Sequence, residues 1–330
     1  MTTLVQVKGL AKTFTVSAPW LSRMLRGKPR QFVQAVDDIS FSIERGQTLA
    51  LVGESGCGKT TVARLLVGLD DPTRGAVDFD GRDIRVTLAS PKRQALRRRM
   101  QMIFQDPSAS LNPRWRVRKI VSEPLTQHGL VRDPQALRER VVVLLNSVGL
   151  DAADLDKLPH QFSGGQRQRI SIARALATEP DFLVCDEPTS ALDVSVQAQV
   201  LNLIKTLQRQ SGLTCLFISH NLAVVPHVSN QVAVMYLGRL VELADRATLF
   251  SRPRHPYTQM LLDAIPDIAM GGRSRNPVRG EVPNPLRPPT GCGFHPRCPH
   301  ANSRCSVERP EWAAFQGIQV ACHAVIEGRI

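Results

Sequence analysis

Short apolar runs and helical segments alternate along the first 250 residues of the chain. Strand-like runs of β-branched and aliphatic residues span positions 4–7, 39–43, 48–52, 182–186, 214–219 and 231–236. Several are too continuously apolar for a sheet with one wet face, so they are interpreted as strands buried on both faces. Helical periodicity spans 59–69, 165–177 and 194–210. This alternation predicts an α/β fold with a largely parallel sheet.

Composition divides the chain further. The stretch from about 105 to 165 has no strongly β-like run and contains the helix-compatible segment 134–148, which predicts a helical subdomain inserted between two strands. Beyond Ser251 the chain becomes rich in Pro, Arg and Cys, which predicts one domain over 1–250 and an extension over 251–330. Residues 17–35 are expected to form a basic surface loop that contains Trp20, Arg23, Arg26, Lys28 and Arg30. Residues 276–289 are typical of a polyproline-like connector.

Charge and cysteine usage narrow the function classes. The 330 residues include 42 Lys+Arg and 29 Asp+Glu, a net charge of +13, which favours polyanionic partners: nucleic acid, acidic lipid headgroups or nucleotide phosphates. No stretch approaches the roughly 18 apolar residues of a membrane helix, and the N-terminus lacks a signal-peptide pattern, so we expect a cytosolic chain. Cys57, Cys185 and Cys215 lie in apolar or Gly-rich segments, which argues against a disulfide scaffold.

A glycine-rich segment follows the apolar run 48–52 and precedes a predicted helix. Its glycines let backbone N–H groups curl around a phosphate, while its Lys reaches the β/γ oxygens and its first Thr offers a hydroxyl to Mg²⁺. With a strand before it and a helix after it, this pattern predicts a phosphate-binding loop. The loop comprises Gly53, Glu54, Ser55, Gly56, Cys57, Gly58, Lys59, Thr60 and Thr61.

Two adjacent carboxylates end the apolar run 182–186. Asp186 is suited to hold Mg²⁺, and Glu187 to orient and polarise a water that attacks the terminal phosphate. A solvated acidic turn is an equally good interpretation of these two residues alone. The phosphate loop decides in favour of catalysis.

A third segment, FSGGQRQRI, starts a helix with bare N–H groups that could meet an anion. A plain Ser N-cap is the simpler interpretation of these residues alone. The residues concerned are Ser163, Gly164, Gly165 and Gln166.

Over about residues 1–250 the sequence resembles the ATP-binding subunits of ABC transporters, since these segments occur in that family's order. FSGGQ matches the family signature LSGGQ, with Phe162 in the Leu position. The resemblance implies that Gln105 is the Q-loop residue and a further Mg²⁺ ligand, Asp193 belongs to the D-loop, and His220 is the switch histidine. It also implies that an aromatic residue, best matched by Phe14, stacks on adenine.

The resemblance also implies partners. In that family ATP lies between the phosphate loop of one cassette and the signature of another, so this chain is expected to work with a second cassette, different or identical. The catalytic residues would be Lys59, Glu187 and His220. Two transmembrane permease subunits and an extracytoplasmic solute-binding protein would complete the assembly, with the chain on the cytoplasmic face of the membrane.

The tail contains four cysteines within 31 residues: Cys292, Cys298, Cys305 and Cys322. Their spacing lacks tight CxxC pairs, yet four thiolates are a complete ligand set for a metal centre, and unligated thiols are the alternative. The segment HPYT and this Cys pattern resemble the C-terminal region of the oligopeptide/dipeptide and nickel importer branch, as does FQDPSASLNPRWRV at 104–117. That resemblance implies a [4Fe–4S] cluster in preference to zinc.

The sequence thus predicts an ATPase that energises peptide import. One alternative is a soluble ABC ATPase that acts on nucleic acid, but the interval 61–162 has no room for the coiled coils of repair enzymes, so no nucleic acid partner is expected. Another is an importer of a different small solute, such as nickel or glutathione. A regulatory cassette would tolerate loss of Glu187 or His220, and both are present.

Overall fold

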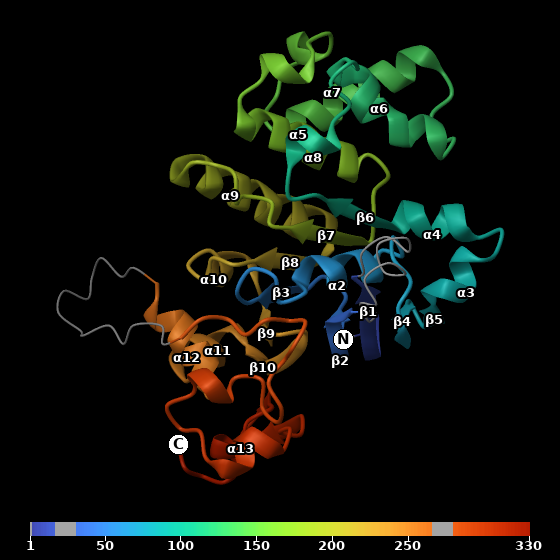
Figure 1. The fold of residues 1–330 in the computed structure, drawn as a ribbon. Helices are drawn as coiled ribbons and strands as arrows, with labels where there is room; N and C mark the ends of the chain where they lie inside the picture. Colours follow the sequence, from blue (N-terminus) through green and yellow to red (C-terminus); the bar gives the residue numbers. More distant parts are fainter. Residues whose placement is uncertain (1, 17–30, 266–279) are drawn as a thin grey trace, which may run out of the picture.

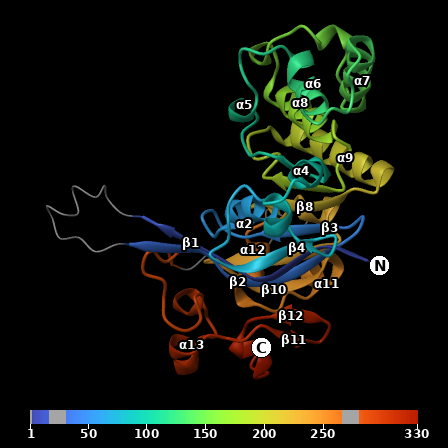
Figure 2. The same cartoon turned by 90° about the vertical axis from the view of Figure 1, so that its right-hand side faces the viewer.

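The computed structural model describes residues 2–16, 31–265 and 280–330. Helices α5–α8 lie at one end of the molecule and the C-terminal extension at the other, with two sheets between them (Figures 1 and 2). Trp20, Arg23, Arg26, Lys28 and Arg30 lie outside the described residues.

The main sheet has eight strands in the order β11-β12-β10-β9-β3-β8-β7-β6. Its central strands are parallel and bury both faces, as the continuously apolar runs predict: every residue of β3, β7 and β8 is buried. The parallel strands are β3 (Thr48–Val52), β6 (Met100–Ile103), β7 (Phe182–Asp186), β8 (Thr214–Ser219) and β9 (Gln231–Tyr236). The α/β prediction is therefore confirmed.

A second sheet corrects the prediction of one largely parallel sheet. Strands β1 (Thr3–Thr15), β2 (Phe32–Glu44), β4 (Arg74–Phe79) and β5 (Arg82–Asp83) form an antiparallel sheet in the order β2-β1-β4-β5. Buried and exposed positions alternate along the second half of β2, which is typical of a strand with one wet face. Residues 32–35, assigned above to a basic loop, belong to β2.

Helices cover the main sheet and form a separate cap. Helix α8 packs on α5, α6 and α7, and their apolar side chains share a core with β7 and β8. The α-helices are α2 (Lys59–Leu66), α3 (Ile84–Leu88), α4 (Arg93–Arg99), α5 (Pro107–Ser110), α6 (Val117–Gln127), α7 (Pro134–Ser147), α8 (Gly164–Leu176), α9 (Val194–Ser211), α10 (Val225–Val228), α11 (Arg246–Ser251), α12 (Pro256–Asp263), α13 (Ser303–Val307) and α14 (His323–Ile326). Short 3₁₀ turns span Ala152–Asp154, Pro159–Gln161 and His295–Arg297.

The C-terminal extension continues the main sheet. Strand β10 (Arg239–Asp245) pairs antiparallel with β9 and also with β12 (Ile318–Val320), which pairs with β11 (Ala313–Phe315). One hydrophobic core includes Tyr236 of β9 together with Tyr257, Phe294 and Val320 from beyond Ser251. The extension is thus packed onto the sheet through a common core.

Among the described residues, no helix combines the length and the apolar character needed to cross a membrane.

His255 caps helix α12 in the shared core. Its Nδ1 accepts a hydrogen bond from the Tyr257 backbone N–H at 3.0 Å, and burial lowers the pKa of this imidazole from 6.5 to about 3. The folded protein therefore contains neutral His255, whereas the unfolded chain takes up a proton below pH 6.5.

Stability should consequently fall as the pH decreases from 6.5 towards 3, since only the unfolded state gains the proton. Between pH 7.5 and pH 5 this group alone should cost about 2 kcal/mol of unfolding free energy. Denaturant titration at both pH values checks this, with His255→Asn as the matched variant because Asn also caps helices but does not titrate. An equal pH dependence of the parent and the variant would contradict the assignment.

Candidate functional site

The predicted phosphate loop connects β3 to α2, and two of its glycines are sterically required. A Cβ on Gly53, at φ 154°, would lie 2.1 Å from the Met235 carbonyl oxygen. A Cβ on Gly58, at φ 108°, would lie 2.1 Å from the Ala35 carbonyl oxygen. Only glycine fits where the loop passes this close to neighbouring backbone. The strands beneath therefore determine the curl of the loop.

Lys59, the first residue of α2, is buried inside this loop. Its ammonium donates to the carbonyl oxygens of Gly53 at 2.8 Å and Glu54 at 2.9 Å, and lies 3.8 Å from the Cys57 sulfur. A fixed cation next to the first N–H groups of a helix creates a site for an anion such as phosphate.

Thr60 and Asp186 meet across the gap between α2 and β7. The Thr60 hydroxyl donates to the Asp186 carboxylate at 3.2 Å, and burial raises the pKa of Asp186 to about 6. A hydroxyl and a buried carboxylate are hard oxygen ligands of the kind Mg²⁺ prefers. This donor set therefore fits the predicted magnesium ion.

Glu187 is where three separate motifs meet. Its backbone has φ 45°, an uncommon conformation for a residue with a side chain, and such strain is typical of functional sites. Its Oε2 accepts a hydrogen bond from the Gln105 side-chain amide at 3.1 Å and lies 3.0 Å from His220 Nδ1. Residues 82 and 33 positions away in the sequence thus contact the carboxylate suited to activate water.

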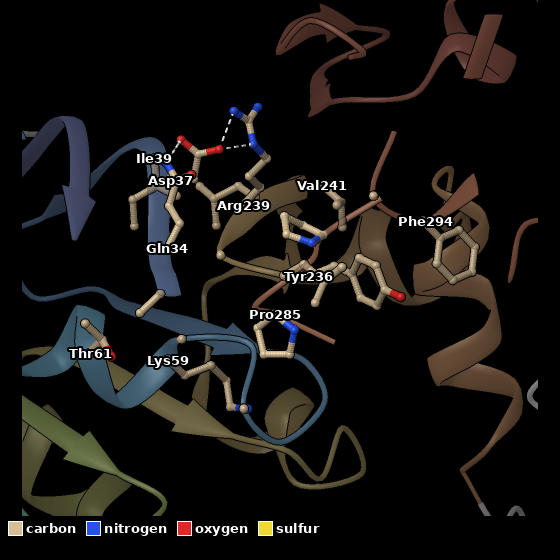
Figure 3. Close-up of a pocket in the computed structure, with 18 of the residues that line it drawn as sticks. Gln34, Asp37, Ile39, Lys59, Thr61, Tyr236, Arg239, Val241, Pro285 and Phe294 are labelled. Carbon is tan, nitrogen blue, oxygen red and sulfur yellow. Dashed lines mark hydrogen bonds and ion pairs between the residues drawn. The ribbon is translucent and has the colours of Figure 1, made fainter. Parts of the chain in front are cut away.

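A cavity of about 1150 Å³ opens over these groups. Figure 3 shows Lys59 and Thr61 on one side of it and Tyr236, Pro285 and Phe294 on the other. The predicted residues on its wall are Ser55, Gly56, Gly58, Lys59, Thr60, Thr61, Gln105, Glu187 and His220. Gly53, Glu54, Cys57 and Asp186 are not part of this wall, and all of them except Glu54 are buried.

Phe14 does not line the cavity, although it was the candidate for stacking on adenine. It is 37% exposed, and its cross-strand partner Val33 is on the cavity wall. Lys12 Nζ lies 5.1 Å from the centre of the Phe14 ring. The structure thus places Phe14 beside the cavity.

The signature residues lie away from the cavity, at the start of α8. Ser163 Oγ accepts from the Gln166 backbone N–H at 3.3 Å, and the Gln166 side chain accepts from the Ser163 N–H at 3.0 Å, a reciprocal capping box. Gly165 packs against Val196, because a Cβ there would come within 2.4 Å of that side chain. Asp193 takes the N-cap position of α9 without capping it through its side chain. Within one chain these residues do not complete the cavity.

Sequence reasoning missed the contribution of the extension to this site. Arg297 forms an ion pair with Glu54 of the phosphate loop, and Pro285, Phe294 and Trp312 line the cavity. The HPYT segment resembles a family motif within the extension, but nothing in the sequence connects it to the phosphate loop. Pro285, Pro288 and Pro289, which belong to the expected connector, line part of the cavity wall.

The four tail cysteines do not form a metal site in the described part of the chain. Burial raises the pKa of Cys292 and Cys298 to about 11 and also raises the pKa of Cys322. Neighbouring tail thiols add to the increase at each of these three, so the cysteines share one region. Nevertheless, no group of three or more His, Cys, Asp or Glu side chains among the described residues is arranged to hold a metal ion. The structure thus gives no support to the predicted iron–sulfur or zinc centre.

Two family models match the chain. Residues 36–190 match the model described as ABC transporter, and residues 241–305 match the model described as oligopeptide/dipeptide transporter, C-terminal region. The second match contains the HPYT segment and three of the four tail cysteines.

Curated relatives resemble the chain over nearly its whole length. An oligopeptide transport ATP-binding protein of Bacillus subtilis is 45% identical over 97% of both chains. A di/tripeptide transport ATP-binding protein of Pseudomonas aeruginosa is 46% identical over 98% of both chains. A dipeptide transport ATP-binding protein of Escherichia coli is 48% identical over 90% of this chain and 89% of the relative.

Among solved structures, a dimeric post-hydrolysis ATP-binding cassette bound to ADP and phosphate superposes with a TM-score of 0.64. It is 25% identical and covers 73% of this chain and 98% of that one. A subunit of an ABC transporter complex from Clostridium perfringens gives a TM-score of 0.60 at 26% identity, over 76% of this chain and 96% of its own.

Proposed function

Since the chain belongs to the ABC transporter family as an ATP-binding protein that hydrolyses ATP, we propose that it powers the import of di- or oligopeptides through separate membrane-spanning subunits. The observation that carries the substrate class is the joint presence of the cassette and the oligopeptide/dipeptide transporter region in one chain. The relatives described above, which are named as oligopeptide, di/tripeptide and dipeptide transport ATP-binding proteins, agree with that class.

The site residues act on the nucleotide as follows. Lys59 and the loop N–H groups bind the β- and γ-phosphates, and Thr60 and Asp186 hold Mg²⁺. Bound Mg²⁺ neutralises charge that develops on the phosphates. Glu187 orients and polarises the attacking water, while Gln105 and His220 hold its carboxylate from two sides.

A second cassette completes the site. The signature residues lie at the N-terminus of α8, outside the cavity that their own chain forms: Ser163, Gly164, Gly165 and Gln166. Their exposed helix N-terminus is suited to contact phosphate held by another cassette. ATP would close the pair, and hydrolysis would reopen it.

The remaining partners follow from the same proposal. The pair of cassettes docks on two permease subunits at the cytoplasmic face of the membrane, and an extracytoplasmic protein delivers the peptide. Helices α5 and α6, which follow Gln105, belong to the group of helices α5–α8 at one end of the molecule. We assign these two helices to the permease contact. No observation favours nucleic acid or another solute as the substrate.

Replacing Glu187 by Gln should lower the ATP turnover number by at least about 100-fold, because the variant cannot accept a proton from the attacking water. ATP binding should be retained, since Lys59 and Thr60 are unchanged. Phosphate release and nucleotide titration measure the two effects. Glu139→Gln, at an exposed position of α7, is the matched control with the same chemical change. Normal hydrolysis by the Glu187 variant would exclude it as the catalytic base.

Affinity purification from gently solubilised membranes should recover the chain with two multi-span subunits and a second cassette. Uptake of labelled dipeptide by vesicles containing this complex should require ATP. Recovery with nucleic acid and no membrane subunit would instead support the soluble ATPase.

The metal centre is a separate proposal that rests on the cysteine pattern and on the resemblance of the tail to the importer branch. If the four thiols bind a cluster, the purified chain should contain iron and absorb visible light, and Cys322→Ser should lose both. Cys215→Ala, in the buried core, is the control. A chain that contains neither iron nor zinc would rule out the centre.

A further inference from the structure

Glu54, the second residue of the phosphate loop, is held at two points by the C-terminal extension. The Arg297 guanidinium donates to both carboxylate oxygens of Glu54, at 2.7 and 2.9 Å. The Glu54 backbone N–H donates to the Tyr257 hydroxyl at 2.8 Å. Two segments, 203 and 243 positions away in the sequence, therefore converge on one residue of the loop.

The Arg297 side chain of this ion pair is buried in the protein interior, and the Glu54 side chain is partly exposed. The Arg297 side chain is only 2% exposed, and that of Glu54 is 23% exposed. The guanidinium also donates to the Tyr236 hydroxyl at 3.3 Å and lies 5.8 Å from the ring centres of Tyr236 and Phe294. A bidentate Arg–carboxylate pair in such surroundings has little freedom to rearrange.

Tyr257 is rigidly placed as well. It is fully buried, with its ring centre 4.6 Å from that of Tyr236 and 5.4 Å from that of Phe294. His255 caps the helix that carries it, and Pro256 begins that helix. The HPYT segment thus places a hydroxyl at the backbone of the phosphate loop.

A carboxylate in a phosphate loop poses an electrostatic problem. Glu54 is adjacent to residues whose N–H groups are suited to bind nucleotide phosphates, and an unpaired carboxylate there would repel them. Arg297 supplies the opposite charge, and it comes from the extension.

We propose that Arg297 is a positioning residue for nucleotide binding: it neutralises Glu54 and, together with Tyr257, holds the phosphate loop in the conformation that accepts ATP. The extension that distinguishes this branch thereby becomes part of the ATP site. This inference rests on the proposed role of the loop as the ATP site.

The proposal predicts a dependence on ligand charge that a merely structural role would not produce. Loss of Arg297 leaves the Glu54 charge next to the phosphates, so ATP and ADP should bind more weakly. Adenosine, which has no phosphate, should bind nearly as before. Removing the Glu54 charge as well should restore ATP affinity.

The test uses the full chain with five variants and measures Kd for MgATP, MgADP and adenosine by fluorescence competition. Arg297→Met should raise the Kd for MgATP about tenfold and that for adenosine less than about twofold. The double variant Arg297→Met/Glu54→Gln should return to within about threefold of the parent. Arg297→Lys, which keeps the charge and is less disruptive to folding, should lie between the parent and Arg297→Met.

Arg304→Met is the matched control, because Arg304 also forms ion pairs within the extension but with Glu308 and Glu327, so its Kd for MgATP should not change. An unchanged Kd in Arg297→Met, an equal loss for ATP and adenosine, or no recovery in the double variant would overturn the proposal. Lys59→Ala tests the location of the ATP site independently of the role of Arg297. If this variant binds MgATP normally, the proposed ATP site itself is wrong.

Discussion

Parallel pairing of four strands is the constraint on which the site depends. Because β3, β8, β7 and β6 run in the same direction, their carboxyl ends meet at one edge of the main sheet. The phosphate loop follows β3, Asp186 and Glu187 end β7, His220 follows β8 and Gln105 follows β6. Slipping one strand out of register would separate these groups by several ångströms.

The backbone at this edge is shaped by what lies next to it. Gly53 and Gly58 approach the carbonyl oxygens of Met235 and Ala35 so closely that a side chain would collide. Glu187, in contrast, adopts a left-handed conformation while keeping its side chain, since its carboxylate is held by Gln105 and His220. In the proposed mechanism the first arrangement makes room for phosphate, and the second directs the Glu187 carboxylate towards it.

The extension changes how the cassette is understood. It continues the main sheet through β12, shares a core with β9 and contacts the phosphate loop through Tyr257 and Arg297. Its proline-rich segment lines the same cavity as Lys59. The extension, which differs from the cassette in composition, is thus in direct contact with the phosphate loop of the cassette.

The sequence by itself determined the parallel strands β3, β7, β8 and β9 and the identity of the chemical groups, because both are encoded in local patterns. Residues 49–52 and 182–185 are apolar at every position, and the loop 53–61 carries its own phosphate-binding signature. Strands β4, β5, β6, β10, β11 and β12 were missed, since they are short or carry charged residues. The antiparallel sheet of β1 and β2 was also missed, because strand direction depends on which partners meet.

Only the tertiary structure decided that Arg297 pairs with Glu54 and that Pro285 lines the cavity. It likewise placed Phe14 beside the cavity and left the tail cysteines short of a metal-binding arrangement in the described residues. Each of these outcomes depends on contacts between residues far apart in the sequence. Local periodicity does not encode such contacts, which arise only when the extension packs on the sheet and shares its core.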